Sequence, residues 1–162
     1  MRRIVVGVIG PGEGAAHAEC EWAYQLGGAI ATQGWILLTG GRNVGVMDAA
    51  SRGAKAQGGL TIGILPDSNP KNVSAAVDIA IYTNLGNARN TINVLSSDVV
   101  VACGMGLGTA SEVALALKVG KPTLLFQPNP VHAAFFQEIS QGKIQTLSSV
   151  EDVIRVIRSY CA

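Results

Sequence analysis

Residues 98–112 read DVVVACGMGLGTASE, and this stretch decides the fold. The apolar run after Asp98 is typical of a buried strand, the glycines are typical of a loop, and residues 109–119 are mostly helix formers. Glycine lets the backbone approach a ligand closely, and the first N–H groups of a helix have no acceptor within the helix. The stretch therefore predicts a strand, a loop and a helix whose junction binds phosphate or carboxylate.

The same alternation of short apolar runs and helical runs extends along the chain. The expected strands are residues 3–9, 35–38, 61–65, 79–82, 98–103 and 122–126. The expected helices are residues 17–33, 46–57, 87–95, 109–119 and 150–159, and a short helix and a strand are expected after the loop with Pro128 and Pro130. Apolar strands separated by helices predict a mainly parallel sheet with helices on both faces. With right-handed crossovers this is a doubly wound, Rossmann-like α/β fold, and we expect residues 1–162 to form one domain.

The composition argues against several classes of protein. Charged residues make up 14% of the chain, the net charge is +1 and no basic run occurs, so no nucleic-acid partner is expected. Cys20, Cys103 and Cys161 are odd in number and far apart, which argues against a disulfide framework and a metal site made of side chains. Without a leader-like segment or an apolar run of about 18 residues, we expect a cytoplasmic protein with no membrane span.

The chain is apolar, with 48% hydrophobic residues and a mean hydropathy of +0.33. One interpretation is that part of its surface is buried between subunits, which predicts a homo-oligomer. The other is that small residues raise the figure without any interface. The composition leaves both open.

Glycine-rich segments follow most of the expected strands, at residues 10–14, 39–45, 86–90 and 104–108. The loops after the carboxyl ends of parallel strands converge on one edge of the sheet, where ligands bind. A turn can require glycine for its own sake, but several such loops at one edge favour a phosphate-bearing ligand. The first loop does not keep the GxGxxG spacing and the second strand lacks a terminal acidic residue, which argues against ordinary NAD binding.

Three groups of residues resemble known motifs. They are Gly40-Gly41-x-x-x-Gly45-x-Met47, Arg89, and Gly106-x-Gly108-Thr109-x-x-Glu112. Together they are similar to the superfamily that contains the Lonely Guy cytokinin-activating phosphoribohydrolases and the molybdenum cofactor carrier proteins. The resemblance covers residues 4–126.

The departures from the hydrolase pattern distinguish two branches of this superfamily. In the hydrolases the last motif reads PGGxGTxxE, and an arginine precedes its proline by fifteen positions, which places that pair on Arg89 and Glu112. The proline is replaced by Gly104, the first glycine by Met105, and Asn90 stands where the hydrolases have lysine. With these departures the chain resembles the molybdenum cofactor carrier branch more closely.

The resemblance to the carrier branch implies a protein that binds and protects molybdopterin, the organic part of the cofactor, by holding its phosphate at the glycine-rich edge. It also implies a dimer or tetramer, with molybdoenzymes as recipients. The residues expected to bind the cofactor are Gly10, Gly12, Gly40, Gly41, Asn43, Gly45, Arg89, Asn90, Gly104, Gly106, Leu107, Gly108, Thr109 and Glu112.

The resemblance to the hydrolases implies an alternative function, the release of free base and ribose 5-phosphate from a nucleoside 5′-monophosphate. Glu112 would then stabilise positive charge on the ribose or position water, and Arg89 would bind the substrate or polarise the leaving base. A third hypothesis is a nucleotide-sensing module without catalysis.

Each candidate residue also has a purely structural interpretation. Thr109 and Glu112 have the spacing of a capping box, which Ser148 and Glu151 repeat at the last expected helix. Arg89 could be a solvated cation or pair with Asp98. Met47 and Cys103 are expected in the core, and His17 and His132 on the surface.

Overall fold

The computed structural model describes residues 2–160, and within this range seven strands form one parallel sheet in the order β4-β3-β2-β1-β5-β6-β7. The strands are β1 (Val5–Ile9), β2 (Ile36–Thr39), β3 (Thr61–Leu65), β4 (Ile79–Tyr82), β5 (Val99–Cys103), β6 (Thr123–Phe126) and β7 (Gln145–Leu147). From β1 the chain first builds outward to β4 and then restarts at β5 on the other side. The direction of winding therefore reverses between β1 and β5.

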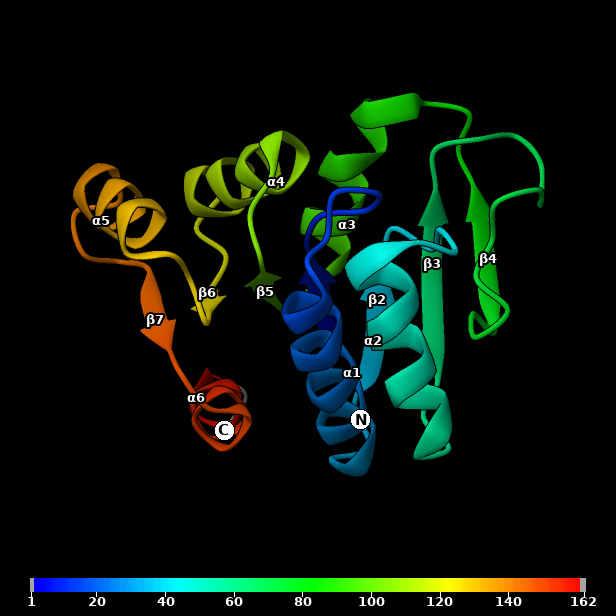
Figure 1. Cartoon of the computed structure of the whole chain (residues 1–162), viewed down its shortest axis with the longest axis horizontal. Coiled ribbons are helices and arrows are strands. Elements are labelled where there is room, and N and C mark those ends of the chain that lie inside the picture. The colour runs from blue at the N-terminus through cyan, green and yellow to red at the C-terminus, as the bar shows by residue number, and fades with distance from the viewer. Residues whose placement is uncertain (1, 161–162) are drawn as a thin grey trace.

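Helices cover both faces of this sheet (Figure 1). They are α1 (His17–Thr32), α2 (Gly45–Ala56), α3 (Asn90–Ser96), α4 (Leu107–Lys118), α5 (Pro130–Ile139) and α6 (Val150–Tyr160), and a short 3₁₀ helix, η1 (Gly86–Arg89), precedes α3. Helices α1, α2 and α6 pack in one hydrophobic cluster, and α3, α4 and α5 pack in another. The predicted doubly wound, Rossmann-like fold is confirmed.

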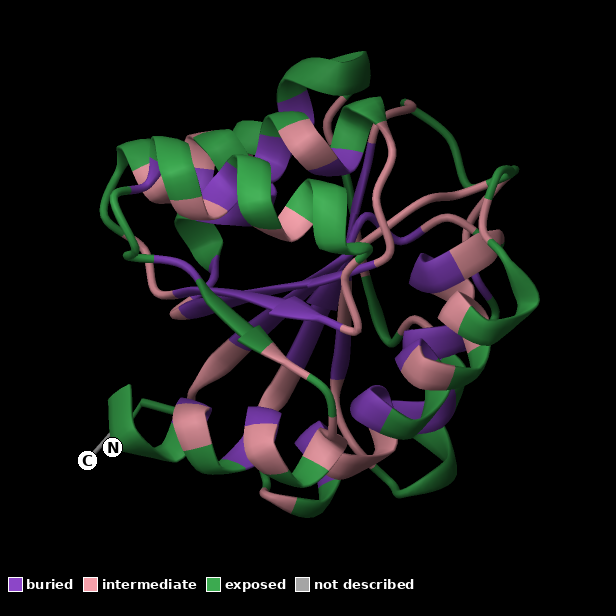
Figure 2. Cartoon of the chain, turned by 60° about the vertical axis from the view of Figure 1, so that its left-hand side comes forward, coloured by how far each residue is buried: buried purple, intermediate pink, exposed green. Residues whose placement is uncertain are grey.

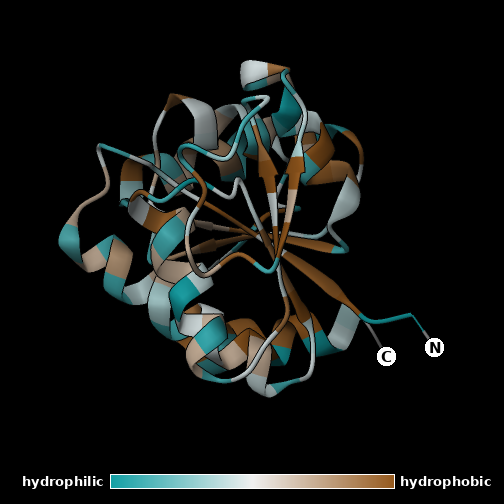
Figure 3. Ribbon diagram, turned by 90° about the vertical axis from the view of Figure 1, so that its right-hand side faces the viewer, coloured by the Kyte–Doolittle hydropathy of each residue, from teal (hydrophilic) through white to brown (hydrophobic). Residues whose placement is uncertain are grey.

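Alternate residues of the central strands supply the two clusters. Val99 and Val101 of β5 face the cluster with α1, and Val100 and Ala102 face the cluster with α4. Successive side chains of a strand point to opposite faces, so a strand between two helix layers must be apolar throughout. Figure 2 shows these buried strands between helices with exposed outer faces, and Figure 3 shows the hydrophobic strands in brown.

Helices α1 and α2 approach each other closely because glycines lie at their contact. A Cβ atom at Gly27 would overlap the carbonyl oxygen of Ala50, and one at Gly53 would overlap that of Tyr24. This close packing places the start of α2, with Met47, beside the carboxyl ends of β1 and β2.

Several element boundaries differ from expectation. The helix expected at residues 87–95 is divided into η1 and α3, and α4 begins at Leu107 rather than at Thr109. Pro130 opens α5, because the Asn129 side chain caps the helix by accepting from the Val131 N–H at 2.8 Å. His132 therefore lies in a helix, where a loop was expected. Among residues 2–160, no helix has the length and apolar character needed to cross a bilayer.

Candidate ligand-binding site

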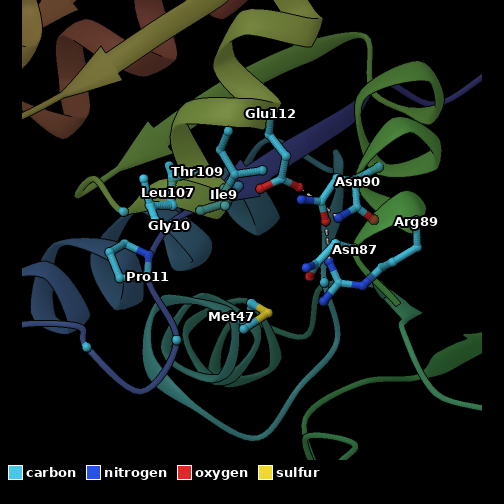
Figure 4. A pocket seen from close by; sticks show the side chains of 17 residues that line it. Ile9, Gly10, Pro11, Met47, Asn87, Arg89, Asn90, Leu107, Thr109 and Glu112 are labelled. Atoms are coloured by element: carbon cyan, nitrogen blue, oxygen red, sulfur yellow. Dashed lines mark hydrogen bonds between the residues drawn. The ribbon is translucent and has the colours of Figure 1, made fainter. Parts of the chain in front are cut away.

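A cavity of about 310 Å³ opens at the point where the direction of winding reverses. Its walls are the loop after β1, the start of α4, the segment from η1 into α3, and the side chain of Met47 from α2 (Figure 4). A crevice at the carboxyl ends of the strands is where ligands bind in doubly wound sheets. The volume is at the lower end of the range of small-molecule pockets.

The start of α4 forms one wall and offers hydrogen-bond donors. Gly106 is the N-cap, with an extended backbone, and its carbonyl oxygen accepts the first helical hydrogen bond from the Ala110 N–H at 2.8 Å. The N–H groups of residues 107–109 thus precede the helical ladder, and no acidic residue lies in this first turn. A Cβ atom added at Gly108 would meet no atom within 4 Å, so its Cα faces open space. This wall is suited to an anion.

The capping-box interpretation of Thr109 and Glu112 is wrong. Thr109 is the third residue of α4, and Glu112 lies in the second turn, out of reach of the N-cap amide. Glu112 instead accepts a hydrogen bond across the cavity wall from the Asn93 Nδ2 atom of α3, at 3.0 Å. The glutamate is therefore directed toward the cavity (Figure 4).

The last helix has a cap, but it is shifted by one residue from the predicted pair of Ser148 and Glu151. The Ser149 hydroxyl accepts from the Asp152 N–H at 3.1 Å, and the Ser149 carbonyl accepts from the Val153 N–H. The spacing alone predicted the kind of cap but not its register.

Glu112 is a buried carboxyl, only 6% exposed. Burial raises its pKa to about 7, while the hydrogen bond from Asn93 and the charge of Arg89 oppose that rise. Glu112 therefore changes its charge near neutral pH. Only its Oε1 atom has a hydrogen-bond donor within residues 2–160.

Arg89 is a buried cation at the end of η1. Its Nη1 atom donates to Asn90 Oδ1 at 2.9 Å, and its Nε atom has no partner among the described residues. No carboxylate of residues 2–160 lies within 4.0 Å of the guanidinium. Burial lowers the pKa of Arg89, but an arginine keeps its proton at neutral pH. A buried cation with no carboxylate in direct contact is unfavourable, so the site favours an anionic ligand.

Neither structural interpretation of Arg89, a solvated cation or a pair with Asp98, is correct, since Arg89 is buried and Asp98 binds elsewhere. Asp98 binds Arg2 and accepts from the Val5 N–H at 2.8 Å, at the opposite end of the sheet. The place of Arg89 depends instead on Gly40, where a Cβ atom would lie 3.0 Å from Arg89 Nη2 and 2.7 Å from Met47 Sδ. Glycine at this position therefore makes room for both side chains.

Most of the sequence-predicted binding residues line this cavity. They are Gly10, Gly12, Gly40, Arg89, Asn90, Gly106, Leu107, Gly108, Thr109 and Glu112. Their proximity does not by itself assign them a role.

Four predicted residues lie outside the cavity, and the three glycines among them pack against other parts of the chain. Gly41 faces Gly63 and Leu65 of β3, Gly45 faces Gly12, and Gly104 faces the Glu19 carboxylate. Asn43 is exposed, and its N–H donates to the Asn72 carbonyl at 2.9 Å. Some glycines of the βα loops thus serve the packing of the loop and not the ligand space.

Other lining residues were not among the predicted binding residues: Val8, Ile9, Pro11, Gly14, Met47, Asn87 and Asn93. Asn93 is the polar one that is deeply buried, at 2% exposed. It follows Arg89 by four residues, a spacing that places two residues on one helical face. That spacing was the available signal for it.

The remaining candidates lie away from the cavity. Cys103 is buried, its Sγ atom donates to the Glu19 carbonyl at 3.4 Å, and burial raises its pKa to about 12, so it is not a reactive thiolate. His17 is exposed beside Glu21. Cys161 lies outside the described residues. No group of three or more His, Cys, Asp or Glu that could hold a metal occurs within residues 2–160.

Comparison with known proteins identifies similar chains. The model of the SLOG cluster4 family matches residues 3–154. The structure of the molybdenum cofactor binding protein from the phototrophic bacterium Rippkaea orientalis is 58% identical, covers 100% of this chain and 99% of its own, and superposes with a TM-score of 0.98. The molybdenum cofactor carrier protein of Chlamydomonas reinhardtii is 47% identical over 99% of both chains, with a TM-score of 0.92.

A more distant similarity is to an enzyme. The cytokinin riboside 5′-monophosphate phosphoribohydrolase of Mycobacterium tuberculosis is 36% identical over 100 residues. The match covers 60% of this chain and 54% of the enzyme.

Proposed function

This chain belongs to the SLOG cluster4 family, and we propose that it binds molybdenum cofactor in the cavity between β1 and β5 and carries it in a protected form. The resemblance to the molybdenum cofactor carrier proteins is confirmed, since structures at 47–58% identity cover almost the whole chain. The role of a carrier is inferred from those neighbours. It requires a cavity whose residues can bind the cofactor.

The observation that carries the proposal is the buried, unpaired Arg89 facing the same cavity as the start of α4. The N–H groups of residues 107–109 and the open space at Gly108 would hold the molybdopterin phosphate. The guanidinium of Arg89 would contact an anionic part of the cofactor. The metal would stay bound to the cofactor itself.

The carrier role is tested with purified protein and freshly released molybdopterin. In the presence of the protein, oxidative loss of molybdopterin should slow, because the cavity walls keep bulk solvent and oxygen from part of the ligand. Serum albumin at equal concentration is the control for non-specific protection. Equal decay with the two proteins, together with no measurable binding, would contradict the proposal.

A second candidate function, hydrolysis of nucleoside 5′-monophosphates, has one observation in its favour. Arg89 and Glu112, which match the hydrolase motif, line one cavity. Against it, Gly104 and Met105 replace the proline and the first glycine of the hydrolase motif. Incubation with AMP followed by chromatography for free adenine decides the question, and any activity should be lost in Glu112→Gln.

We also propose that the protein is a homo-oligomer, a dimer or a tetramer. Val131, Phe135 and Ile139 of α5 are 73%, 56% and 53% exposed, and their spacing of four places them on one face of the helix. Such an exposed apolar stripe favours a protein interface. Light scattering should give a mass above that of one chain for the wild type and a smaller mass for Phe135→Glu. A wild-type monomer at micromolar concentration would contradict this.

Molybdoenzymes as recipients and a cytoplasmic location stay predictions. The location is supported by the free Cys20 and Cys103, because unpaired thiols are typical of a reducing compartment. Transfer of cofactor from the loaded protein to an apo-molybdoenzyme, measured as recovered enzyme activity, tests whether molybdoenzymes are recipients.

A further inference from the structure

One buried hydrogen-bond acceptor in the cavity has no partner. Asn93 of α3 is 2% exposed and lines the cavity, and its Oδ1 atom accepts no hydrogen bond from residues 2–160. Buried polar side-chain atoms are nearly always hydrogen-bonded, so such an atom at a cavity wall indicates a ligand donor.

The orientation of this amide follows from its neighbour. The Asn93 Nδ2 atom donates to Glu112 Oε1 at 3.0 Å. When Glu112 is ionised, its carboxylate only accepts hydrogen bonds, so the amide nitrogen faces it and the oxygen points elsewhere. The second oxygen of Glu112 has no donor within the described residues either. Two adjacent side chains, joined by a hydrogen bond, therefore offer two free acceptors.

Two other parts of the cavity wall have the opposite character. The start of α4 offers N–H groups, and Arg89 offers its unpartnered Nε donor. A phosphate accepts hydrogen bonds and suits these donors. It does not suit the acceptors of Asn93 and Glu112, which need a ligand group that donates.

We propose that Asn93 and Glu112 recognise a ligand edge with two adjacent N–H donors, as presented by a 2-aminopyrimidin-4-one ring. Such a ring carries a ring N–H beside an exocyclic NH₂, and both the pterin of molybdopterin and guanine contain it. The inference rests on the proposed function for the choice of a pterin. The donor pattern itself is independent of that choice. Asn93 thus determines which ring is bound, while the phosphate is held at the start of α4 whatever ring it carries.

The test compares ligands that differ at this edge, by equilibrium titration at pH 7.5, where Glu112 is mostly ionised and the ring N–H of the ligand keeps its proton. The first pair is 6-hydroxymethylpterin phosphate and its lumazine counterpart, in which a carbonyl replaces the 2-amino group. The second pair is GMP and IMP, which lacks that amino group. The wild type should bind the amino-bearing member of a pair about tenfold more tightly, as expected for one buried hydrogen bond. The tighter pair identifies the ring as pterin or guanine.

Variants assign the discrimination to Asn93. In Asn93→Leu both members of the pair should bind within about twofold of each other, while inorganic pyrophosphate binds as in the wild type. Asn43→Leu makes the same change on an exposed residue outside the cavity and should keep the wild-type ratio. If Asn93→Leu does not fold, Asn93→Ala takes its place. The affinity ratios of the wild type within each ligand pair test the inference without any variant.

The outcomes separate this inference from the carrier role. Equal binding within both pairs by the wild type overturns the inference, and so does ribose 5-phosphate binding as tightly as GMP, which would assign the acceptors to a sugar. Molybdopterin retention with equal pair binding leaves the carrier role intact. Discrimination within a pair without molybdopterin retention overturns the carrier role and keeps the donor-edge site.

Discussion

At the scale of single residues, Glu112 makes the cavity sensitive to pH. Its pKa is raised by burial from an ordinary 4.5 to about 7. The folded protein therefore holds a proton that the unfolded chain has released between these values, and stability must fall as the pH rises through this window. Above about pH 7 both states are ionised and this contribution to the pH dependence ends.

Replacing Glu112 by Gln should remove that dependence. We expect the unfolding free energy of the wild type, relative to Glu112→Gln, to fall by at most about 3 kcal/mol between pH 4.5 and pH 8. Urea unfolding of both proteins at intervals of pH measures it, and carboxylates such as Asp78 and Asp98 contribute equally to both. Parallel stability profiles would show that Glu112 is not a buried acid.

A substitution at Gly108 tests whether the start of α4 binds the anion, without lowering the stability of the fold. Gly108→Ala should weaken pyrophosphate binding by about tenfold, because the methyl group would enter the open space in front of α4. Alanine favours a helix by up to about 1 kcal/mol over glycine, so stability should not fall. Gly28→Ala, in the middle of α1 and outside the cavity, is the matched control and should bind normally. Unchanged binding by Gly108→Ala would place the anion elsewhere.

At the scale of elements, strands β3 and β4 were predictable and the start of α4 was not. Residues 61–65 and 79–82 form β3 and β4 as predicted, because their apolar and β-branched residues favour a strand. At α4, Thr109 was the expected N-cap, but Gly106, three residues earlier, is the N-cap and has an extended backbone, and Leu107 is 94% exposed. The spacing of a capping box in the sequence therefore does not determine which residue is the N-cap.

The contact of α1 with α2 depends on a glycine that has no room for a side chain. Gly27→Ala should destabilise the protein by about 1–3 kcal/mol, since the new methyl group would overlap the carbonyl oxygen of Ala50. Urea unfolding measures the change, with Gly28→Ala, the neighbouring position in the same helix, as its control. If Gly27→Ala were as stable as the wild type, the close contact between α1 and α2 would not contribute to the unfolding free energy.

At the scale of the whole molecule, alternation of strands and helices was enough to predict the doubly wound sheet and the edge where glycines gather. It placed Arg89 and Glu112 at that edge, and both line the cavity. The spacing from Arg89 puts Asn93 on the same helical face, but its contact with Glu112 was missed because it depends on α3 lying beside α4 in space. The unpartnered state of Arg89 was equally hidden, since only the fold removes Asp98 from its reach.

The central claim is that the buried charge of Arg89 is kept for the cargo. Its most direct test is equilibrium titration of molybdopterin under anaerobic conditions with wild type, Arg89→Met and Arg42→Met. Arg42 already has a carboxylate partner, Glu13 at 2.9 Å, and serves as the control. We predict that Arg89→Met binds about 10–100-fold more weakly, as for a lost charged hydrogen bond, at unchanged or higher stability, and that Arg42→Met binds normally. Wild-type affinity in Arg89→Met would contradict the account.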